Sequence, residues 1–289
     1  MSRPALHAED VSKSFGGTSV LDGVDLSVDA GETVVLLGPN GTGKSVLVSC
    51  LAGGTTPSSG NIEVLGDKPA SRPGTTSFLL QDALCLDKLT GRENISFYSR
   101  LNPSFTDKWQ ELVDLFEIAD QLDQPVEHYS GGMRRKIELA IALSIDAQLY
   151  ILDEPTAALD LTMVREVHHQ LSELRDAGKA VLVTTHLPMD ADAADRVVFI
   201  TGDGVVASGT PDSIKAEVPP VVEASLKNAP TITEGVIGGE VFRGDGVVRG
   251  IVRPDTDPNS LVSHLPEARV TEPTYSDLFN YYVHLKKVN

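Results

Sequence analysis

The sequence contains few cysteines and few basic residues. Cys50 and Cys85 are the only cysteines among 289 residues. Two cysteines are too few for a disulfide framework or a cysteine-rich zinc site, so we expect a reducing compartment. Lys and Arg number 24 against 41 Asp and Glu, which is a formal net charge of −17. Because nucleic-acid phosphates are bound by clustered Lys and Arg, this balance argues against a nucleic-acid partner.

Long apolar runs are also missing. The first ten residues, MSRPALHAED, contain no apolar signal core. No run approaches the roughly 18 apolar residues that a membrane-spanning helix needs. We therefore expect a cytoplasmic protein whose contact with a membrane goes through a partner.

The order of the apolar patterns predicts the fold class. Short strand-like runs come first, a helical block follows over about 84–147, and strand-like and helical runs then alternate. This order predicts an α/β domain over 3–217 with a largely parallel sheet, into which the helical block is inserted as a subdomain. The composition changes near EVPPVVEASLKNAP. We expect 218–289 to form a small accessory domain.

The segment GPNGTGKS, Gly38 to Ser45, lies between two apolar runs and fits the phosphate-loop pattern in full. Its glycines let successive backbone N–H groups point at phosphate oxygens, and the helix that starts near Gly43 adds the positive end of its dipole. Lys44 reaches the terminal phosphates, and the Ser45 hydroxyl can ligate Mg²⁺. A glycine-rich turn with a chance lysine is the alternative, and the flanking strand and helix argue against it.

Two carboxylates end a later apolar run, LYILDEP. Asp153 can hold Mg²⁺ through water, and Glu154 can accept a proton from the water that attacks the γ-phosphate. Two acids at the end of a strand are often only solvated, so this interpretation depends on the phosphate loop. Together the two segments predict one site for Mg²⁺ and a nucleotide.

Five further motifs stand in the order found in the nucleotide-binding subunits of ATP-binding-cassette (ABC) transporters. SKSFGG precedes the phosphate loop, and SFLLQ, YSGGM, AALD and VLVTTH follow it. The chain resembles this family over about 3–217. The resemblance implies a P-loop NTPase cassette with an antiparallel β portion and an inserted helical subdomain. It also implies ATP and Mg²⁺ as ligands and ATP hydrolysis as the activity.

The resemblance implies a role for single residues. Phe15 stacks on adenine, Gln81 contacts Mg²⁺ and water, and His186 senses the γ-phosphate. Ser130 opens a helix that forms a second anion site, and simple helix capping by Ser130 is compatible with that role. The expected catalytic residues are Lys44, Gln81, Glu154 and His186. The expected metal ligands are Ser45, Gln81 and Asp153. The expected nucleotide contacts are Phe15, Gly38, Pro39, Asn40, Gly41, Thr42, Gly43, Lys44, Ser45, Val46, Gln81, Ser130, Gly131, Gly132, Met133, Asp160 and His186.

The signature segment departs from the usual Leu-Ser-Gly-Gly-Gln at Tyr129 and Met133. The Ser-Gly-Gly core is intact, so we expect activity to be retained. YSGGMRRK and LTGRENISFYSRL are similar to drug-resistance export ATPases of the daunorubicin type, although AALD lacks the Gly that usually precedes Leu in that group. VTEPTYSDLFNYYVHL resembles an element near the end of the same exporters. Locally, Thr274 and Asp277 predict a capped packing helix.

The resemblance also implies partners. Two copies of the chain are expected to pair head to tail, with each ATP between the phosphate loop of one copy and the signature of the other. A separate membrane permease would place the chain at the cytoplasmic face of the membrane, for export of a drug, lipid or other amphipathic molecule. The alternatives are an importer ATPase, a soluble cassette ATPase of iron–sulfur assembly or ribosome regulation, and a degenerate module that only senses ATP. Intact Lys44, Asp153, Glu154 and His186 argue against the last.

Overall fold

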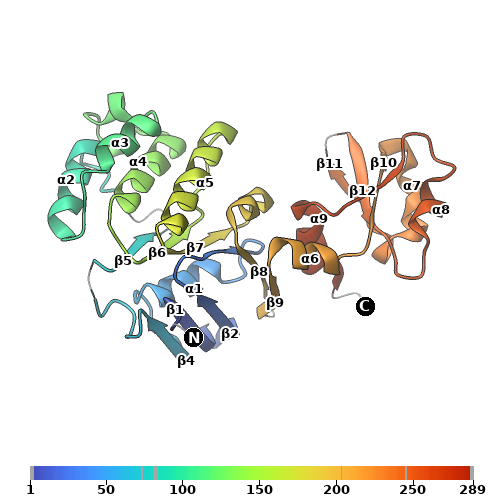
Figure 1. Cartoon of the computed structure of the whole chain (residues 1–289), viewed down its shortest axis with the longest axis horizontal. Helices are drawn as coiled ribbons and strands as arrows, with labels where there is room; N and C mark the ends of the chain where they lie inside the picture. The colour runs from blue at the N-terminus through green and yellow to red at the C-terminus, as the bar shows by residue number, and fades with distance from the viewer. Residues whose placement is uncertain (1–2, 73, 81–83, 203, 245, 287–289) are drawn as a thin grey trace.

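The computed structural model describes residues 3–72, 74–80, 84–202, 204–244 and 246–286, and Figure 1 shows their arrangement. A larger N-terminal part carries a smaller C-terminal unit at one end of the molecule. Within the described ranges, no helix is long and apolar enough to cross a bilayer. Gln81 lies outside these ranges, so the role predicted for it stays a prediction.

A six-stranded sheet forms the centre of the larger part. Its strands, in spatial order, are β5 (Thr76–Leu79), β6 (Leu149–Asp153), β7 (Ala180–Thr185), β3 (Thr33–Leu37), β8 (Arg196–Thr201) and β9 (Gly204–Gly209). Neighbours pair in parallel except β9, which runs antiparallel to β8. β3, β6 and β7 are buried along their whole length, because other elements cover both faces of the sheet. The predicted parallel core is therefore present.

An antiparallel sheet covers one face of the larger part. It consists of β2 (Thr18–Val28), β1 (Leu6–Phe15) and β4 (Ser59–Val64), in that order. Helix α1 (Lys44–Leu51) contacts both this sheet and the central one. Alternate residues of the central strands, Val34 and Leu36 among them, join the apolar core on this side, while Val35 and Leu37 join the core on the other.

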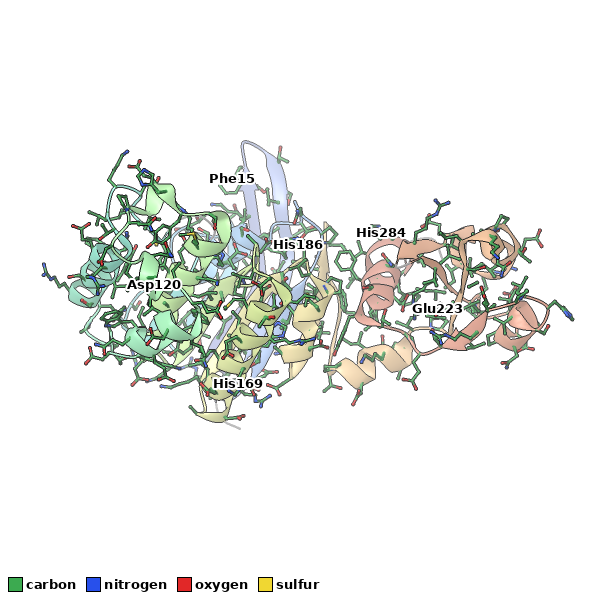
Figure 2. All side chains as sticks on the ribbon, turned by 90° about the horizontal axis from the view of Figure 1, so that it is seen from above. Phe15, Asp120, His169, His186, Glu223 and His284 are labelled. Atoms are coloured by element: carbon green, nitrogen blue, oxygen red, sulfur yellow. The ribbon has the colours of Figure 1, made fainter. Side chains whose placement is uncertain are left out.

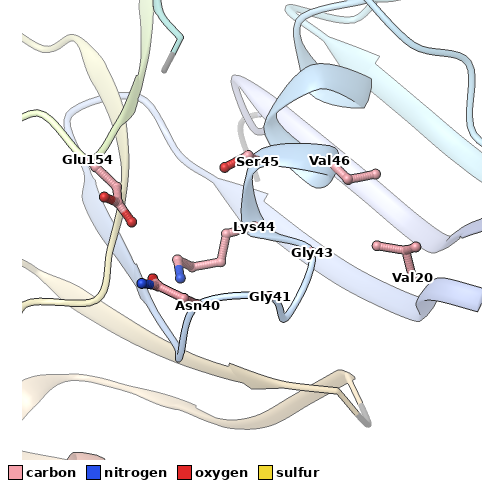
Figure 3. Close-up of a pocket in the computed structure, with 8 residues that line it drawn as sticks. All are labelled: Val20, Asn40, Gly41, Gly43, Lys44, Ser45, Val46 and Glu154. Carbon is pink, nitrogen blue, oxygen red and sulfur yellow. The ribbon is translucent and has the colours of Figure 1, made fainter. Parts of the chain in front are cut away.

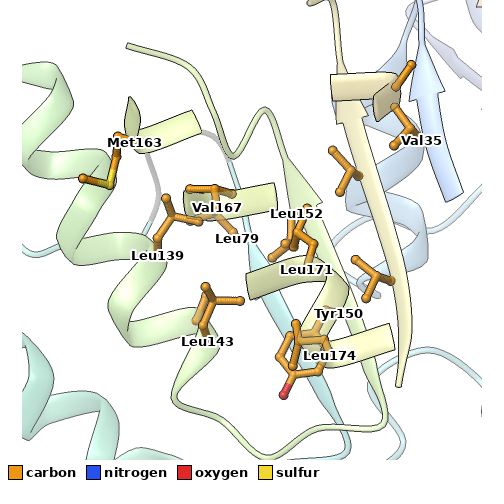
Figure 4. Close-up of a cluster of buried hydrophobic side chains, with 14 of the residues drawn as sticks. Val35, Leu79, Leu139, Leu143, Tyr150, Leu152, Met163, Val167, Leu171 and Leu174 are labelled. Atoms are coloured by element: carbon orange, nitrogen blue, oxygen red, sulfur yellow. The ribbon is translucent and has the colours of Figure 1, made fainter. Parts of the chain in front are cut away.

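Helices cover the other face. They are α2 (Gly91–Leu101), α3 (Trp109–Leu115), η1 (Ala119–Gln121), η2 (Val126–His128), α4 (Gly131–Leu143), α5 (Leu161–Asp176) and η3 (Pro188–Ala193). Leu139 and Leu143 of α4 pack with Val167 and Leu171 of α5 above the sheet (Figure 4). The block predicted over about 84–147 thus consists of separate helices joined by turns. Thr90 starts α2 through a reciprocal capping box with its third helical residue.

The C-terminal unit has its own antiparallel sheet, in the order β11 (Phe242–Gly244), β12 (Val247–Ile251), β10 (Val221–Ser225) and β13 (Arg269–Thr271). Helix α6 (Pro211–Glu217) precedes this unit, whose own helices are η4 (Leu226–Asn228), α7 (Ala229–Ile232), η5 (Thr233–Gly235), η6 (Ile237–Gly239), α8 (Pro258–Val262), α9 (Tyr275–Asn280) and η7 (Tyr281–Leu285). The Thr274 hydroxyl accepts the Asp277 N–H, and the Asp277 carboxylate accepts the Thr274 N–H. The predicted capped helix is therefore confirmed.

The end of the chain packs back on the larger part. The Tyr282 ring is 1% exposed and stacks on Phe199 of β8, with ring centroids 5.0 Å apart and an interplanar angle of 29°. Its hydroxyl donates to Glu217 Oε2 at 3.0 Å. Tyr282 and Phe199 belong to one continuous apolar cluster, so the C-terminal helix shares the core of the central sheet.

Candidate active site

The phosphate-loop segment joins β3 to α1 in a conformation that requires glycine at two positions. A Cβ on Gly38 would lie 2.4 Å from the carbonyl oxygen of Ile200 in β8. Gly43 has φ +90°, and a Cβ there would lie 2.8 Å from the Val20 carbonyl oxygen and 2.7 Å from Leu21 Cδ2. Gly43 precedes α1, and among the described residues no side chain caps this helix. The first backbone N–H groups of α1 can therefore face an anion.

Lys44 is the buried cation of this loop. It is 5% exposed, and its ammonium donates to the carbonyl oxygens of Gly38 at 2.7 Å and Pro39 at 3.0 Å. Burial lowers the pKa of the Lys44 ammonium, and the charges of Glu154 and Asp153 oppose that shift. The loop thus folds around a positive charge in the position that the sequence predicted for a phosphate contact.

Glu154 and His186 form a pair at the ends of two adjacent strands. Glu154 follows β6 and His186 follows β7, and the Glu154 N–H donates to the Thr184 carbonyl oxygen at 2.8 Å. Glu154 Oε1 lies 2.9 Å from His186 Nδ1. Because a carboxylate accepts hydrogen bonds, the imidazole donates from Nδ1. Glu154 has φ +51°, a left-handed conformation that costs about 1–3 kcal/mol for such a residue and is found at functional sites.

The phosphate loop and Glu154 line one cavity of about 380 Å³. Figure 3 shows the Glu154 carboxylate and the Lys44 ammonium on facing sides of it. The lining residues are Val20, Asn40, Gly41, Gly43, Lys44, Ser45, Val46 and Glu154. Six of the predicted loop residues and the predicted base therefore line one cavity, although they are more than a hundred positions apart in the chain, whereas Gly38, Pro39, Thr42 and His186 are not part of its lining.

The carboxylate expected to act on Mg²⁺ is buried and is not among the residues that line this cavity. Asp153 is 1% exposed, and the Thr184 hydroxyl donates to its Oδ1. The described residues contain no group of three or more His, Cys, Asp or Glu side chains that could form a metal cage. Mg²⁺ in nucleotide sites is usually held by one or two protein oxygens, phosphates and water, so Ser45 and Asp153 fit it as donors.

The signature residues lie away from the cavity of their own chain. Ser130 is exposed and caps α4, its hydroxyl accepting the Met133 N–H at 3.2 Å, so the capping interpretation is confirmed. Gly131 and Gly132 face the Asp160 loop, and a Cβ on Gly132 would lie 2.9 Å from the Ala158 carbonyl oxygen. The hydroxyl of Tyr129, next to Ser130, donates to a backbone carbonyl at 2.6 Å, so this unusual residue anchors the segment.

Asp160 and Phe15 are also placed outside the cavity lining. Asp160 caps α5 and accepts the Met163 N–H at 2.9 Å. Phe15 is the last residue of β1 and is 51% exposed, with the Lys13 ammonium 4.9 Å from its ring centroid. Figure 2 shows Phe15 and His186 in the larger part of the molecule. An exposed ring at a strand end is free to stack on a flat ligand.

Two features of this region were not anticipated from the sequence. Val20, in β2, lines the cavity, and an isolated valine in a strand-like run carries no signal for such a place. Asp190, in η3, accepts hydrogen bonds from Thr156 and Thr185, which flank Glu154 and His186 in the sequence. Its position within an acidic, alanine-rich segment, MDADAAD, gave no indication of burial.

The parallel sheet, the glycine-dependent loop and the Glu154–His186 pair define a P-loop nucleoside-triphosphatase. The sequence profile described as ABC transporter matches residues 21–157. Daunorubicin/doxorubicin resistance ATP-binding protein DrrA of Streptomyces peucetius is 33% identical over 277 residues, which is 92% of this chain and 82% of that protein. Nod factor export ATP-binding protein I of Rhizobium meliloti is 36% identical over 216 residues, 72% of this chain and 64% of that protein. The chain therefore belongs to the ABC transporter ATP-binding protein family, whose activity is ATP hydrolysis.

Solved structures agree with this assignment. One described as the ATP-binding subunit of an ABC transporter has a TM-score of 0.67 at 26% identity and covers 74% of this chain and 92% of its own. A bacterial ABC transporter cassette, solved in dimeric form, has a TM-score of 0.65 at 22% identity and covers 71% and 98%. The second likeness concerns the fold alone. The predicted family and fold class are confirmed.

Proposed function

We propose that this chain hydrolyses Mg²⁺-bound ATP as one of a pair of cassettes and powers a separate membrane permease that exports an amphipathic molecule. The observation that carries the proposal is the shared cavity, which the phosphate loop lines together with Glu154, the carboxylate that His186 contacts. A module that only binds ATP has no need of a base held in a left-handed backbone conformation.

The residues divide the work between binding and chemistry. The amides of the loop and the start of α1 bind the phosphates, and Lys44 exchanges its loop carbonyl contacts for phosphate oxygens. Ser45 and Asp153, with Gln81, would hold Mg²⁺, which neutralises phosphate charge when bound. Phe15 stacks on adenine. The roles of the remaining loop residues, Gly38 to Val46, are backbone contacts and loop shape.

Glu154 and His186 act on the attacking water. Water forms a bond to the γ-phosphorus, the bond between that phosphorus and the β-bridging oxygen breaks, and Glu154 takes the proton of the water on a carboxylate oxygen. His186 fixes that carboxylate through the 2.9 Å hydrogen bond from Nδ1. The other side of the His186 ring contacts the γ-phosphate. When hydrolysis removes the γ-phosphate, the positions of His186 and Glu154 therefore change.

A second copy completes the site. Ser130, Gly131, Gly132 and Met133 begin α4 away from the cavity of their own chain, and the Ser130 hydroxyl is exposed. A head-to-tail pair brings this helix start, and Asp160, to the γ-phosphate held by the partner. Each ATP then meets two helix N-termini, and its negative charge stabilises the pair only until hydrolysis.

The permease is proposed to dock on the helical region after Gln81. Apolar side chains are exposed there, with Leu86 at 45%, Phe97 at 43% and Leu101 at 65%. Phe97 and Leu101 line a surface hollow of about 430 Å³ on α2. Such a patch on a charged surface suits a short helix of a partner protein.

The proposed permease determines where the chain is located, whereas the domain division rests on the C-terminal sheet. Contact with the permease would place the chain at the cytoplasmic face of the membrane, and the names of its relatives, which include daunorubicin resistance and Nod factor export proteins, favour export. We propose 3–217 as the ATPase cassette, with a helical subdomain at about 84–147, and 218–289 as a small accessory domain. Its separate sheet and apolar cluster support the division.

The substitution Glu154→Gln tests the chemistry. It keeps the shape of the side chain and removes the base, so ATP turnover should fall by about 100-fold or more while ATP binding survives. The protein should also form a stable pair in the presence of ATP, seen by size-exclusion chromatography. Glu111→Gln, at an exposed position of α3, is the matched control and should retain turnover. Unchanged turnover in Glu154→Gln would rule out Glu154 as the base.

A further inference from the structure

A buried carboxylate joins three segments behind the proposed catalytic pair. Asp190 lies in η3 and is 1% exposed. Its Oδ2 accepts the Thr156 hydroxyl at 2.8 Å and the Thr185 hydroxyl at 2.5 Å. Its Oδ1 lies 2.9 Å from His168 Nε2, on α5. A buried carboxylate with hydrogen-bond donors on both oxygens is a rigid junction, because each lost donor leaves an acceptor without water to replace it.

The two threonines are the neighbours of the proposed base and its partner. Thr156 stands two residues after Glu154, and Thr185 stands immediately before His186. One carboxylate oxygen of Asp190 therefore ties together the two backbone segments from which the 2.9 Å Glu154–His186 contact is made. This side-chain link adds to the backbone pairing of β6 with β7, which ends at Asp153 and Thr184.

The hydrogen bonds of Asp190 help to hold the backbone conformation of Glu154. Glu154 has φ +51°, which such a residue keeps only when its surroundings hold it there. The Glu154 N–H is held by the Thr184 carbonyl oxygen at 2.8 Å, and on the other side of Glu154 the chain is held at Thr156 by Asp190. Removal of the carboxylate would take away the side-chain anchor at Thr156 and leave the backbone hydrogen bond from the Ala157 N–H to the Glu154 carbonyl oxygen, at 3.1 Å, on that side of the turn.

The same junction reaches the phosphate loop. The Thr185 carbonyl oxygen accepts the N–H of Gly38, the first residue of the loop, at 3.3 Å. Thr185 thus contacts the loop through its backbone and Asp190 through its hydroxyl. Asp190 itself is absent from the lining of the cavity, so its influence on the reaction passes through the threonines.

We propose that Asp190 is a positioning residue for ATP hydrolysis, which sets the geometry of Glu154 and His186 through Thr156 and Thr185 and does not touch ATP. The inference rests on the proposed role of Glu154 as the base. It goes beyond that role, because it assigns a catalytic consequence to a carboxylate outside the nucleotide cavity.

Steady-state kinetics of the full-length protein test the proposal. Asp190→Ala should lower kcat at least about tenfold, because misplacement of a catalytic group by about 1 Å can cost about 100-fold. The KM for ATP should stay within about threefold, because the phosphate loop is intact. Asp190→Asn keeps an oxygen that can accept both hydroxyls and should recover kcat to within about threefold of the wild type. Asp192→Ala, an exposed acid in the same short helix, is the control and should change neither constant.

A double-mutant cycle separates positioning from general damage. If Asp190 acts through Glu154, Asp190→Ala should lower turnover by less than about threefold in a Glu154→Gln background, although it lowers it at least about tenfold in the wild type. The proposal would be overturned if the turnover loss of the double variant equalled the product of the losses of the two single variants. A parallel rise in KM, or a failure of Asp190→Asn to recover kcat, would also overturn it.

Two further results keep the test decisive. Should Asp190→Ala fail to fold, Thr156→Val and Thr185→Val each remove one hydroxyl and should lower kcat in the same way, and wild-type kcat in both would overturn the proposal. Unchanged turnover in Glu154→Gln would instead reject the base assignment. If Glu154→Gln loses most of its turnover and Asp190→Ala lowers turnover by the same factor in the Glu154→Gln background as in the wild type, the Asp190 proposal alone is rejected.

Discussion

The replacement of Tyr282 by alanine tests how firmly the C-terminal unit is joined to the ATPase core. Tyr282 is 1% exposed, stacks on Phe199 of the central sheet and donates to Glu217. Truncation of such a buried aromatic residue typically costs about 3–5 kcal/mol in the free energy of unfolding, the cavity included. Tyr282→Phe keeps the stacked ring and loses only the hydroxyl, so it should cost about 1 kcal/mol.

Urea unfolding monitored by tryptophan fluorescence provides the assay. The single tryptophan, Trp109, lies in α3 and packs against the same apolar cluster that contains Tyr282. If this cluster unfolds as one unit, Tyr282→Ala should lower the midpoint seen at Trp109 by about 1–2 M, for a slope of about 3 kcal/mol per M. Leu226→Ala, at a 48% exposed position of the C-terminal unit, should shift the free energy of unfolding by less than about 0.5 kcal/mol.

Two outcomes would refute this reasoning. The midpoint at Trp109 could stay in place for Tyr282→Ala while far-UV circular dichroism shows an additional, earlier transition. The C-terminal unit would then unfold by itself, and the contact between Tyr282 and Phe199 would contribute nothing to the stability of the cassette. Equal effects of Tyr282→Phe and Tyr282→Ala would also contradict it, because the stacked ring is expected to carry most of the free energy.

Ser130→Arg should abolish hydrolysis and leave ATP binding by the monomer intact, since the proposed pairing puts this side chain at the γ-phosphate held by the other copy; native turnover of the pure variant would count against the paired site. Mixed with a Lys44→Ala chain, it forms one composite site with both native halves, and radiolabelled ATP should reveal hydrolysis there. Leu86→Glu should reduce co-sedimentation with permease-containing membranes without weaker ATP binding, whereas Leu86→Met should retain it; equal sedimentation of the two would refute the docking surface. Cys85, whose pKa is raised to about 12 chiefly by burial, should be alkylated by iodoacetamide at pH 8 roughly a thousandfold more slowly than an exposed thiol, as followed by mass spectrometry. Burial also raises the pKa of Cys50, which should likewise react more slowly than an exposed thiol, and rapid modification of the native protein would contradict the burial of both.

The local conformations of the site could be predicted from the sequence because they depend on nearby residues. The phosphate loop has a positive φ at Gly43, which glycine adopts readily. The helices that begin after Ser130, Asp160 and Thr274 are each capped by the hydroxyl or carboxylate of that residue, which accepts the N–H of the residue three positions later. The parallel sheet followed from the alternation of short apolar runs with helical ones, since such strands need crossover helices.

The tertiary structure alone decided which distant residues meet. Asp190 looked like one more solvated acid, and it is buried because Thr156, 34 positions earlier, and His168, 22 positions earlier, are folded against it. The left-handed backbone of Glu154 has no cue in the sequence either, because the contacts that hold it come from a neighbouring strand. Tyr282 stacks on Phe199 for the same reason. Periodicity and capping report on residues a few positions apart, whereas packing free energy depends on residues that only the completed fold brings together.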